Sequence, residues 1–110
     1  MLAHMIDKYI PMTETAYLIL LALFNENHGY GVILEVEKMT QGRIRIGPGT
    51  IYGTLSKMEE DGLIVAIRAE NRRKIYKQTQ MAAELMQVEI KRIGELYQYG
   101  LEWRLKNEQL

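Results

Sequence analysis

The sequence predicts a mainly α-helical protein with one small β-hairpin, arranged as a winged helix-turn-helix followed by a long C-terminal helix. Three observations lead to this prediction. A short segment from Gly47 to Ile64 has a clear helix start, a clear stop and one apolar stripe. Residues 64–79 alternate like two strands around a polar turn, and residues 80–110 continue a single helical pattern. We therefore expect a winged-helix domain over residues 1–79 and a long C-terminal helix over residues 80–110.

Composition predicts a globular protein without a cofactor. The chain has 110 residues, 47% of them hydrophobic and 25% charged, which is ordinary for one domain. It has no Cys, and His4 and His28 are its only imidazoles, so we expect no metal site. The longest apolar run, residues 16–24, is too short to cross a membrane. No signal peptide is apparent at the start, and a cytoplasmic location is expected.

The charge is zero overall but unevenly distributed. Residues 43–77 carry eight basic and four acidic side chains, whereas residues 1–42 carry two basic and five acidic ones. A local positive region steers an anionic partner even when the whole chain is neutral. The middle third is therefore the candidate contact with a nucleic acid.

The N-terminal third predicts an arm and two helices. Residues 1–12 have weak periodicity and end near Pro11, which indicates an arm with about one helical turn. Thr13 is a suitable N-cap for a helix from Glu14 to Asn27. That helix is apolar nearly all round, which predicts burial on more than one side and suggests an oligomer.

A second helix is expected from Tyr30 to Thr40, and its inward residues are Val32, Ile33, Val36 and Met39. His28 precedes it, either as a catalytic or ligand residue or as a helix-end residue. Nothing nearby completes a triad or a metal set, so the helix-end role is favoured. Residues 43–46 alternate polar and apolar over a short extended piece.

The third helix has an unusual polar face. Gly47 suits the N-cap, Pro48 the first helical position and Gly62 a left-handed stop. The apolar stripe faces inward and consists of Ile51, Leu55 and Met58. The opposite face consists of Thr50, Tyr52, Gly53, Thr54, Ser56 and Lys57. A mid-helix Gly costs ~1 kcal/mol against Ala. Either this face is solvated, or it approaches a DNA major groove closely.

The following hairpin is strongly basic. Strands are expected over residues 64–69 and 74–79, and Asn71 in the turn suits a left-handed conformation. The cations at and beside the tip are Arg68, Arg72, Arg73, Lys74 and Lys77. Such a cluster beside a groove-binding helix favours contacts with phosphates.

The C-terminal helix, from Gln80 to the end, carries two apolar stripes. One contains Met86, Ile90, Ile93, Tyr97 and Leu101, and the other contains Met81, Leu85, Val88, Leu96, Tyr99 and Trp103. Two stripes need two partners, which a two-fold homodimer supplies. Tyr97, Tyr99 and Trp103 either line a pocket for a small aromatic or amphiphilic effector or form the dimer core, and the dimer core is favoured.

Several separated motifs resemble the PadR family of bacterial transcriptional regulators, in its shorter-tailed branch. These motifs are residues 28–31 (HGYG), 47–52 (GPGTIY), 55–64 (LSKMEEDGLI) and 73–76 (RKIY). The resemblance implies a winged helix, a homodimer built through the C-terminal helix, and repression relieved by a small molecule. It implies DNA contacts by Thr50, Tyr52 and Lys57 and, in the wing, by Arg72, Arg73 and Lys74. Gln78 stands where the family usually has Leu, and Ala82 where it usually has Gly.

The leading hypothesis is therefore a homodimeric, sequence-specific DNA-binding repressor. Thr50, Tyr52, Thr54 and Lys57 would enter a major groove of a two-fold symmetric operator, with Gly53 permitting close approach. The alternative is a winged-helix module that binds another protein rather than DNA. An enzyme is not expected, because the sequence has no His–carboxylate set and no phosphate-binding loop.

Overall fold

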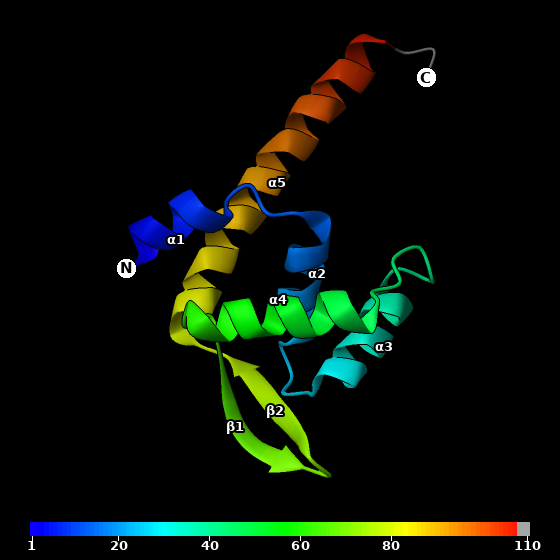
Figure 1. The fold of residues 1–110 in the computed structure, drawn as a ribbon. Coiled ribbons are helices and arrows are strands. Elements are labelled where there is room, and N and C mark those ends of the chain that lie inside the picture. Colours follow the sequence, from blue (N-terminus) through cyan, green and yellow to red (C-terminus); the bar gives the residue numbers. More distant parts are fainter. Residues whose placement is uncertain (108–110) are drawn as a thin grey trace.

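The computed structural model describes residues 1–107, in which helices surround one antiparallel hairpin (Figure 1). The elements are α1 (Leu2–Tyr9), α2 (Glu14–Ala22), α3 (Gly29–Met39), α4 (Pro48–Glu60), β1 (Ile64–Glu70), β2 (Arg73–Gln78) and α5 (Gln80–Lys106). Helix α5 leaves the domain on the side opposite the hairpin. The predicted fold class is confirmed, because the chain is mainly helical with one hairpin and a long C-terminal helix. None of the helices over residues 1–107 is long and apolar enough to span a membrane.

The core lies where α2, α3, α4, the hairpin base and the first turns of α5 meet. Its largest fully buried side chains are Ile19, Leu20, Leu23, Val32, Val36, Ile51, Leu55, Met58, Leu63, Ile64, Leu85 and Glu89. The predicted stripe of α4 is confirmed, and so are its Gly47 N-cap and the left-handed Gly62 (φ 79°). The apolar stripe thus holds α4 against the core, and the opposite face of the helix lies at the surface.

The prediction of an arm with about one helical turn over residues 1–12 is wrong, because Leu2–Tyr9 form a helix of two turns. Leu2, Met5, Ile6 and Tyr9 recur at helical spacing and pack on the core, and α1 contacts α5. The carboxylate of Asp61 holds the end of α1 at 2.7 Å from Lys8 Nζ and 2.6 Å from Tyr9 Oη. These partners lie more than fifty residues away in sequence, which is why local periodicity understated the helix.

Helix α2 ends at Ala22, five residues before the predicted end at Asn27. Leu23 has φ −91° and ψ 15°, and Asn27 instead forms an isolated bridge with Tyr76 of β2. The predicted burial on several sides is only partly right, because Phe24 is 77% exposed. The Thr13 cap is confirmed, since its hydroxyl accepts from Ala16 N–H at 3.1 Å.

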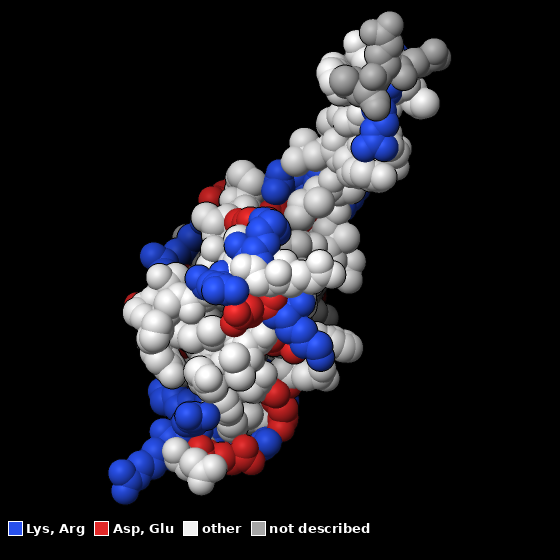
Figure 2. All heavy atoms as spheres, turned by 90° about the vertical axis from the view of Figure 1, so that its right-hand side faces the viewer, with Lys and Arg blue, Asp and Glu red and all other residues white. Residues whose placement is uncertain are grey.

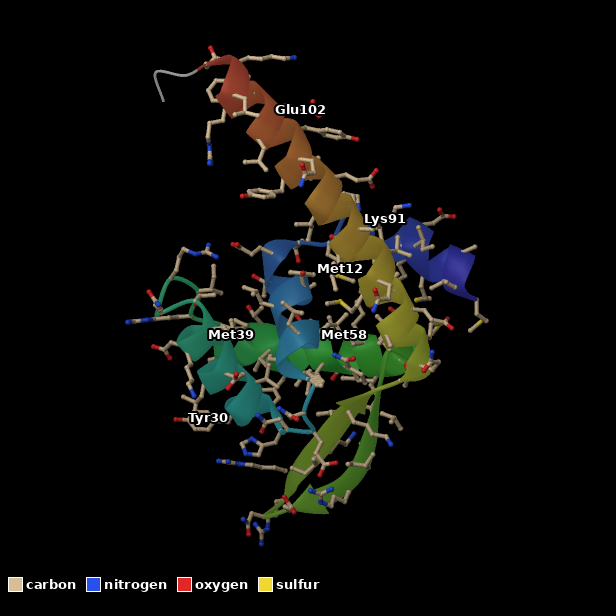
Figure 3. All side chains as sticks on the ribbon, turned by 180° about the vertical axis from the view of Figure 1, so that it is seen from behind. Met12, Tyr30, Met39, Met58, Lys91 and Glu102 are labelled. Atoms are coloured by element: carbon tan, nitrogen blue, oxygen red, sulfur yellow. The ribbon has the colours of Figure 1, made fainter. Side chains whose placement is uncertain are left out.

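Helix α3 begins and ends within one residue of its predicted bounds. Val32 and Val36 are buried as predicted, but Met39, predicted inward, is exposed at the end of the helix (Figure 3). Residues 43–46 form no strand, although their alternation is real, since Ile46 is buried and Arg45 is exposed.

The hairpin pairs Ile64 with Gln78 at its base and Glu70 with Arg73 at its tip. Asn71 (φ 51°) and Arg72 (φ 66°) are both left-handed, so the prediction for Asn71 is confirmed. A bulge between Ala66 and Arg68 shifts the register. Because bulges increase local twist, the outer part of the hairpin curves away from its base.

Helix α5 is capped by Thr79, whose hydroxyl accepts from Ala82 N–H at 3.3 Å. Ala82 is fully buried, and the side-chain amide of Gln78 donates to the carbonyl of Leu20. The two residues that depart from the family pattern thus sit in satisfied positions at the strand–helix junction. Buried side chains from the first turns of α5 belong to the same hydrophobic core as those of residues 1–79. The division into residues 1–79 and 80–110 remains a prediction.

Candidate nucleic-acid interface

Most of the outer face of α4 is exposed to solvent. Tyr52 is 53% exposed, Gly53, Ser56 and Lys57 are also exposed, and an added Cβ at Gly53 would meet nothing within 4 Å. A surface helix with a flat centre at Gly53 can approach a partner backbone closely. This geometry fits the major groove, which admits one helix.

Tyr52 is positioned by the start of α3 and the residues just before it. A Cβ at Gly29 would lie 2.7 Å from Tyr52 Cε1, so only glycine permits the ring to pack there. His28 Nδ1 accepts from Gly31 N–H at 3.0 Å and caps α3, which confirms the helix-end role. The H-G-Y-G motif is therefore a structural device that shapes one side of the candidate interface.

The same segment anchors the wing, which is the hairpin of β1 and β2. A Cβ at Gly31 would lie 2.0 Å from Asn27 Oδ1, so the glycine makes room for the Asn27 side chain. The backbone of Asn27 exchanges two hydrogen bonds with Tyr76, at 3.1 and 2.8 Å. Burial raises the pKa of the Tyr76 hydroxyl, with a further contribution from the charge of Glu59. The two backbone hydrogen bonds thus hold β2 at Tyr76 against the segment before α3.

The cations of the wing contact residues of the helical part. Arg73 lies over the ring of Tyr30 in α3 at 5.5 Å, and Lys74 Nζ lies 3.6 Å from Glu59 of α4. Arg68 pairs with Glu26 at 2.6 Å and with Glu70 at 3.1 Å, and these carboxylates raise its pKa. These contacts connect the hairpin to α3, to α4 and to the segment before α3. Sequence reasoning missed Tyr30 and Glu26 because no local pattern marks a contact across forty residues.

A cleft of about 330 Å³ separates α4 from the wing. It is lined by Gly29, Tyr52, Arg72, Arg73, Lys74 and Tyr76. Figure 2 shows Lys and Arg gathered at the lower end of the molecule, where Figure 1 places the hairpin tip. The structure thus brings four predicted site residues together, namely Tyr52, Arg72, Arg73 and Lys74.

The remaining predicted residues of α4 lie on its other flank. Thr50 borders a hollow of about 320 Å³ that also includes Arg43 and Arg45 from the loop before α4. Sequence reasoning did not assign these two arginines, although the positive region already included them. Thr54 is only partly exposed and, with Lys57, lines a separate cavity toward α1 and α2.

Tyr97, Tyr99 and Trp103 lie on the part of α5 that extends beyond the core. Their exposed fractions are 60%, 60% and 57%, and Leu96 and Leu105 are also more than half exposed. Such a concentration of large apolar side chains on one projecting helix is typical of an interaction surface.

Comparisons with known proteins agree with this geometry. The transcriptional regulator YqjI of Escherichia coli K12 is 33% identical over 63 residues, which cover 57% of this chain and 30% of YqjI. A PadR family transcriptional regulator from Eggerthella lenta superimposes with a TM-score of 0.63 at 20% identity, covering 83% of this chain and 80% of that one. A transcriptional regulator from Clostridium thermocellum gives 0.59 at 18% identity over 96% of both chains.

The two solved structures support the fold, and the family assignment comes from the sequence itself. The pattern that defines the transcriptional regulator PadR-like family matches residues 18–87, which include α3, α4, the wing and the first turns of α5. The family consists of transcriptional regulators rather than enzymes. This chain belongs to the transcriptional regulator PadR-like family.

Proposed function

We propose that this regulator binds double-stranded DNA as a homodimer and represses transcription until a small molecule releases it. The observation that carries the proposal is the cleft between α4 and the wing, where Tyr52 faces Arg72, Arg73 and Lys74. Helix α4 would enter the major groove with Thr50, Tyr52, Gly53, Thr54 and Lys57. The wing cations would contact phosphates beside the groove.

Two features support α4 as the reading helix. Its apolar stripe is fully buried, so the helix cannot rotate without breaking the core. Its exposed side carries hydroxyl and ammonium groups around a glycine without any apolar cluster. A rigid helix with hydrogen-bonding side chains is suited to base edges and phosphates.

Dimerisation is supported by the unpartnered stretch of α5. Leu96, Tyr97, Tyr99, Trp103 and Leu105 are each more than half exposed on the single chain. Burial of these side chains against a second copy would give a two-fold assembly with two α4 helices. The operator is then expected to have two-fold symmetry, with half-sites about one helical turn apart or a multiple.

The test is DNA binding at several salt concentrations, with a fragment from upstream of the coding sequence. Affinity should fall steeply with salt, and Arg73→Ala should reduce the slope of log K against log[salt] by about one unit. The matched control is Lys91→Ala, which removes an exposed cation from α5, far along the chain from the wing. Absence of binding to every fragment at low salt would instead favour a protein-binding module.

Repression is tested separately from binding. A reporter fused to the bound promoter should be expressed more strongly when the gene is deleted. A lower expression in the deletion strain would identify an activator and contradict the repressor assignment, while leaving DNA binding intact.

A further inference from the structure

The loop between α3 and α4, residues 40–47, lies at the end of α4 where that helix begins (Figure 1). It carries Arg43 and Arg45, which border the hollow of about 320 Å³ together with Thr15 of α2 and Thr50 of α4. No Asp or Glu within residues 1–107 lines this hollow. The hollow therefore gathers two guanidinium groups and two hydroxyl groups, all of which can donate hydrogen bonds to an anion.

This hollow and the cleft beside the wing lie on different sides of α4. Within the described part of the chain they share no lining residue. Thr50 borders the hollow and Tyr52 borders the cleft, and two residues along an α-helix are separated by about 200° around its axis. A helix inserted in a major groove has a sugar–phosphate backbone on each side. Cations on both sides of α4 are therefore suited to contact both backbones.

The loop that carries the two arginines has a fixed backbone. Gln41 (φ 53°) and Gly42 (φ 83°) are left-handed and turn the chain after α3. The N–H of Ile44 donates to Thr40 Oγ1 at 3.1 Å, and Ile46 is buried in the core. Because the loop is held in place before DNA arrives, a contact made through it costs little ordering.

Carboxylates orient both guanidinium groups but leave them accessible. Arg43 Nη1 and Nη2 donate to Glu14 at 3.0 and 2.8 Å, which uses two of the five N–H donors of this arginine. Arg45 Nε lies 3.2 Å from Glu37 of α3. The side chains of Arg43 and Arg45 are 60% and 75% exposed. Ion pairs this exposed contribute little to stability, so a phosphate can replace the carboxylate at a small cost.

We infer that this hollow is a second phosphate-binding site, in which Arg43 and Arg45 bind adjacent phosphates of the DNA backbone on the side of α4 away from the wing. The hydroxyl of Thr50 lies beside them as a further donor. A planar guanidinium matches the geometry of phosphate oxygens. The inference rests on the proposed function, because it assigns a partner for the second flank of the helix proposed to read DNA.

The first experiment measures the salt dependence of DNA binding by variants of the loop. Arg43→Gln and Arg45→Gln should each weaken binding at low salt and reduce the slope of log K against log[salt] by about one unit. Arg45→Lys keeps the charge and should keep the slope, which separates loss of a cation from damage to the loop. Lys91→Gln is the control and should leave both affinity and slope unchanged.

The second experiment locates the contact on the DNA. The chain has no Cys, so one introduced thiol can carry an iron chelate that cuts the nearest backbone. At low salt, Arg45→Cys should direct cutting to one side of each half-site and Arg72→Cys to the other side of the same half-site. Lys91→Cys is the matched control on α5 and should direct no cutting within the half-site.

The outcomes separate this inference from the proposed function. A slope unchanged in Arg43→Gln and Arg45→Gln but reduced in Arg73→Ala would overturn the second site and leave DNA binding by α4 and the wing intact. Cutting from position 72 alone, or cutting from both positions on the same side, would do the same. If the wild type binds no DNA fragment at low salt, the proposed function and this inference both fail.

Discussion

Two glycines show how single residues shape the candidate interface in opposite ways. Gly53 has open space around it, and nothing within residues 1–107 requires the absence of a side chain there. Gly29 has no such freedom, because a Cβ would meet the ring of Tyr52 at 2.7 Å. Packing within the chain explains why Gly29 is a glycine. For Gly53 the explanation must come from a contact outside the chain.

Gly53→Ala should therefore separate stability from DNA binding. The substitution removes a helix-interior glycine from an uncrowded site, so the free energy of unfolding should rise by about 1 kcal/mol. DNA affinity should fall by about 1 kcal/mol or more, because the added methyl group enters the close contact. Urea unfolding and DNA titration of the same preparation measure both. Unchanged DNA affinity would indicate that Gly53 lies on an ordinary solvated face that does not contact DNA.

Gly29→Ala should act through Tyr52. The ring must leave its position, so DNA affinity should fall by about as much as in Tyr52→Ala. The double variant that combines Gly29→Ala with Tyr52→Ala tests whether Gly29 acts through the ring. Its loss of DNA affinity should equal that of Tyr52→Ala alone. Additive losses in a DNA titration would show that Gly29 acts independently of the ring.

Among the helices and strands, the short helix α1 and the residues just after it connect two longer helices. One carboxylate, Asp61 at the end of α4, binds both Lys8 and Tyr9, and Glu89 of α5 binds the backbone just after α1. The N-terminal segment thus joins the end of α4 to α5. Lys8 and Tyr9 lower the pKa of Asp61, and Arg92 with the Met12 N–H lowers the pKa of Glu89.

The hydrogen bonds of Asp61 and Glu89 to the N-terminal segment predict that the folded protein loses stability in acid. Both carboxyl groups have folded-state pKa values below their unfolded values, so their contribution is present above the unfolded pKa and is lost as pH falls. The free energy of unfolding in urea should decrease as pH falls below about 5.

The matched variant for this prediction is Asp61→Asn. It should be about 1–3 kcal/mol less stable at pH 7 and should lose less stability between pH 5 and pH 3. Tyr9→Phe should retain most of the acid slope, because the pairing of Asp61 with Lys8 at 2.7 Å remains. An acid slope in Asp61→Asn equal to that of the wild type would assign the titration to other groups.

The whole molecule is elongated, with extents of 55, 34 and 21 Å, because α5 continues beyond the core. A helix that projects with aromatic side chains on it is a poor solution for a single chain in water. Two α5 helices that pack together would bury these residues and set the distance between two α4 helices. The spacing of operator half-sites is therefore a property of the assembly.

Tyr97→Asp should disrupt that assembly. A charge in an apolar contact costs several kcal/mol, so the variant should be monomeric at concentrations where the wild type is dimeric, and its DNA affinity should fall. Gln98→Asp is the control, since it adds the same charge one residue further along α5, at an exposed polar position outside both apolar stripes. Sedimentation velocity measures both. A wild-type monomer at all concentrations would contradict the dimer.

Several elements were determined by the sequence alone, since their signals are local. The Gly47–Pro48 start, the buried stripe of Ile51, Leu55 and Met58, and the left-handed Gly62 depend on neighbours within one or two helical turns. The turn at Asn71 and the basic tip are equally local. Accordingly α4 and the wing were predicted with nearly correct bounds, and the family motifs occur in the same elements.

Only the tertiary structure decided how these elements meet. It placed Arg73 on Tyr30, Asn27 beside Tyr76, and Tyr9 on Asp61, each a contact between segments far apart in the chain. Such contacts leave no periodic trace, because they depend on where the core brings two surfaces together. For the same reason α1 and the cavity beneath it could not be predicted. Periodicity revealed which residues of α4 face outward, and packing decided that Tyr52 borders the wing whereas Thr54 and Lys57 border a cavity.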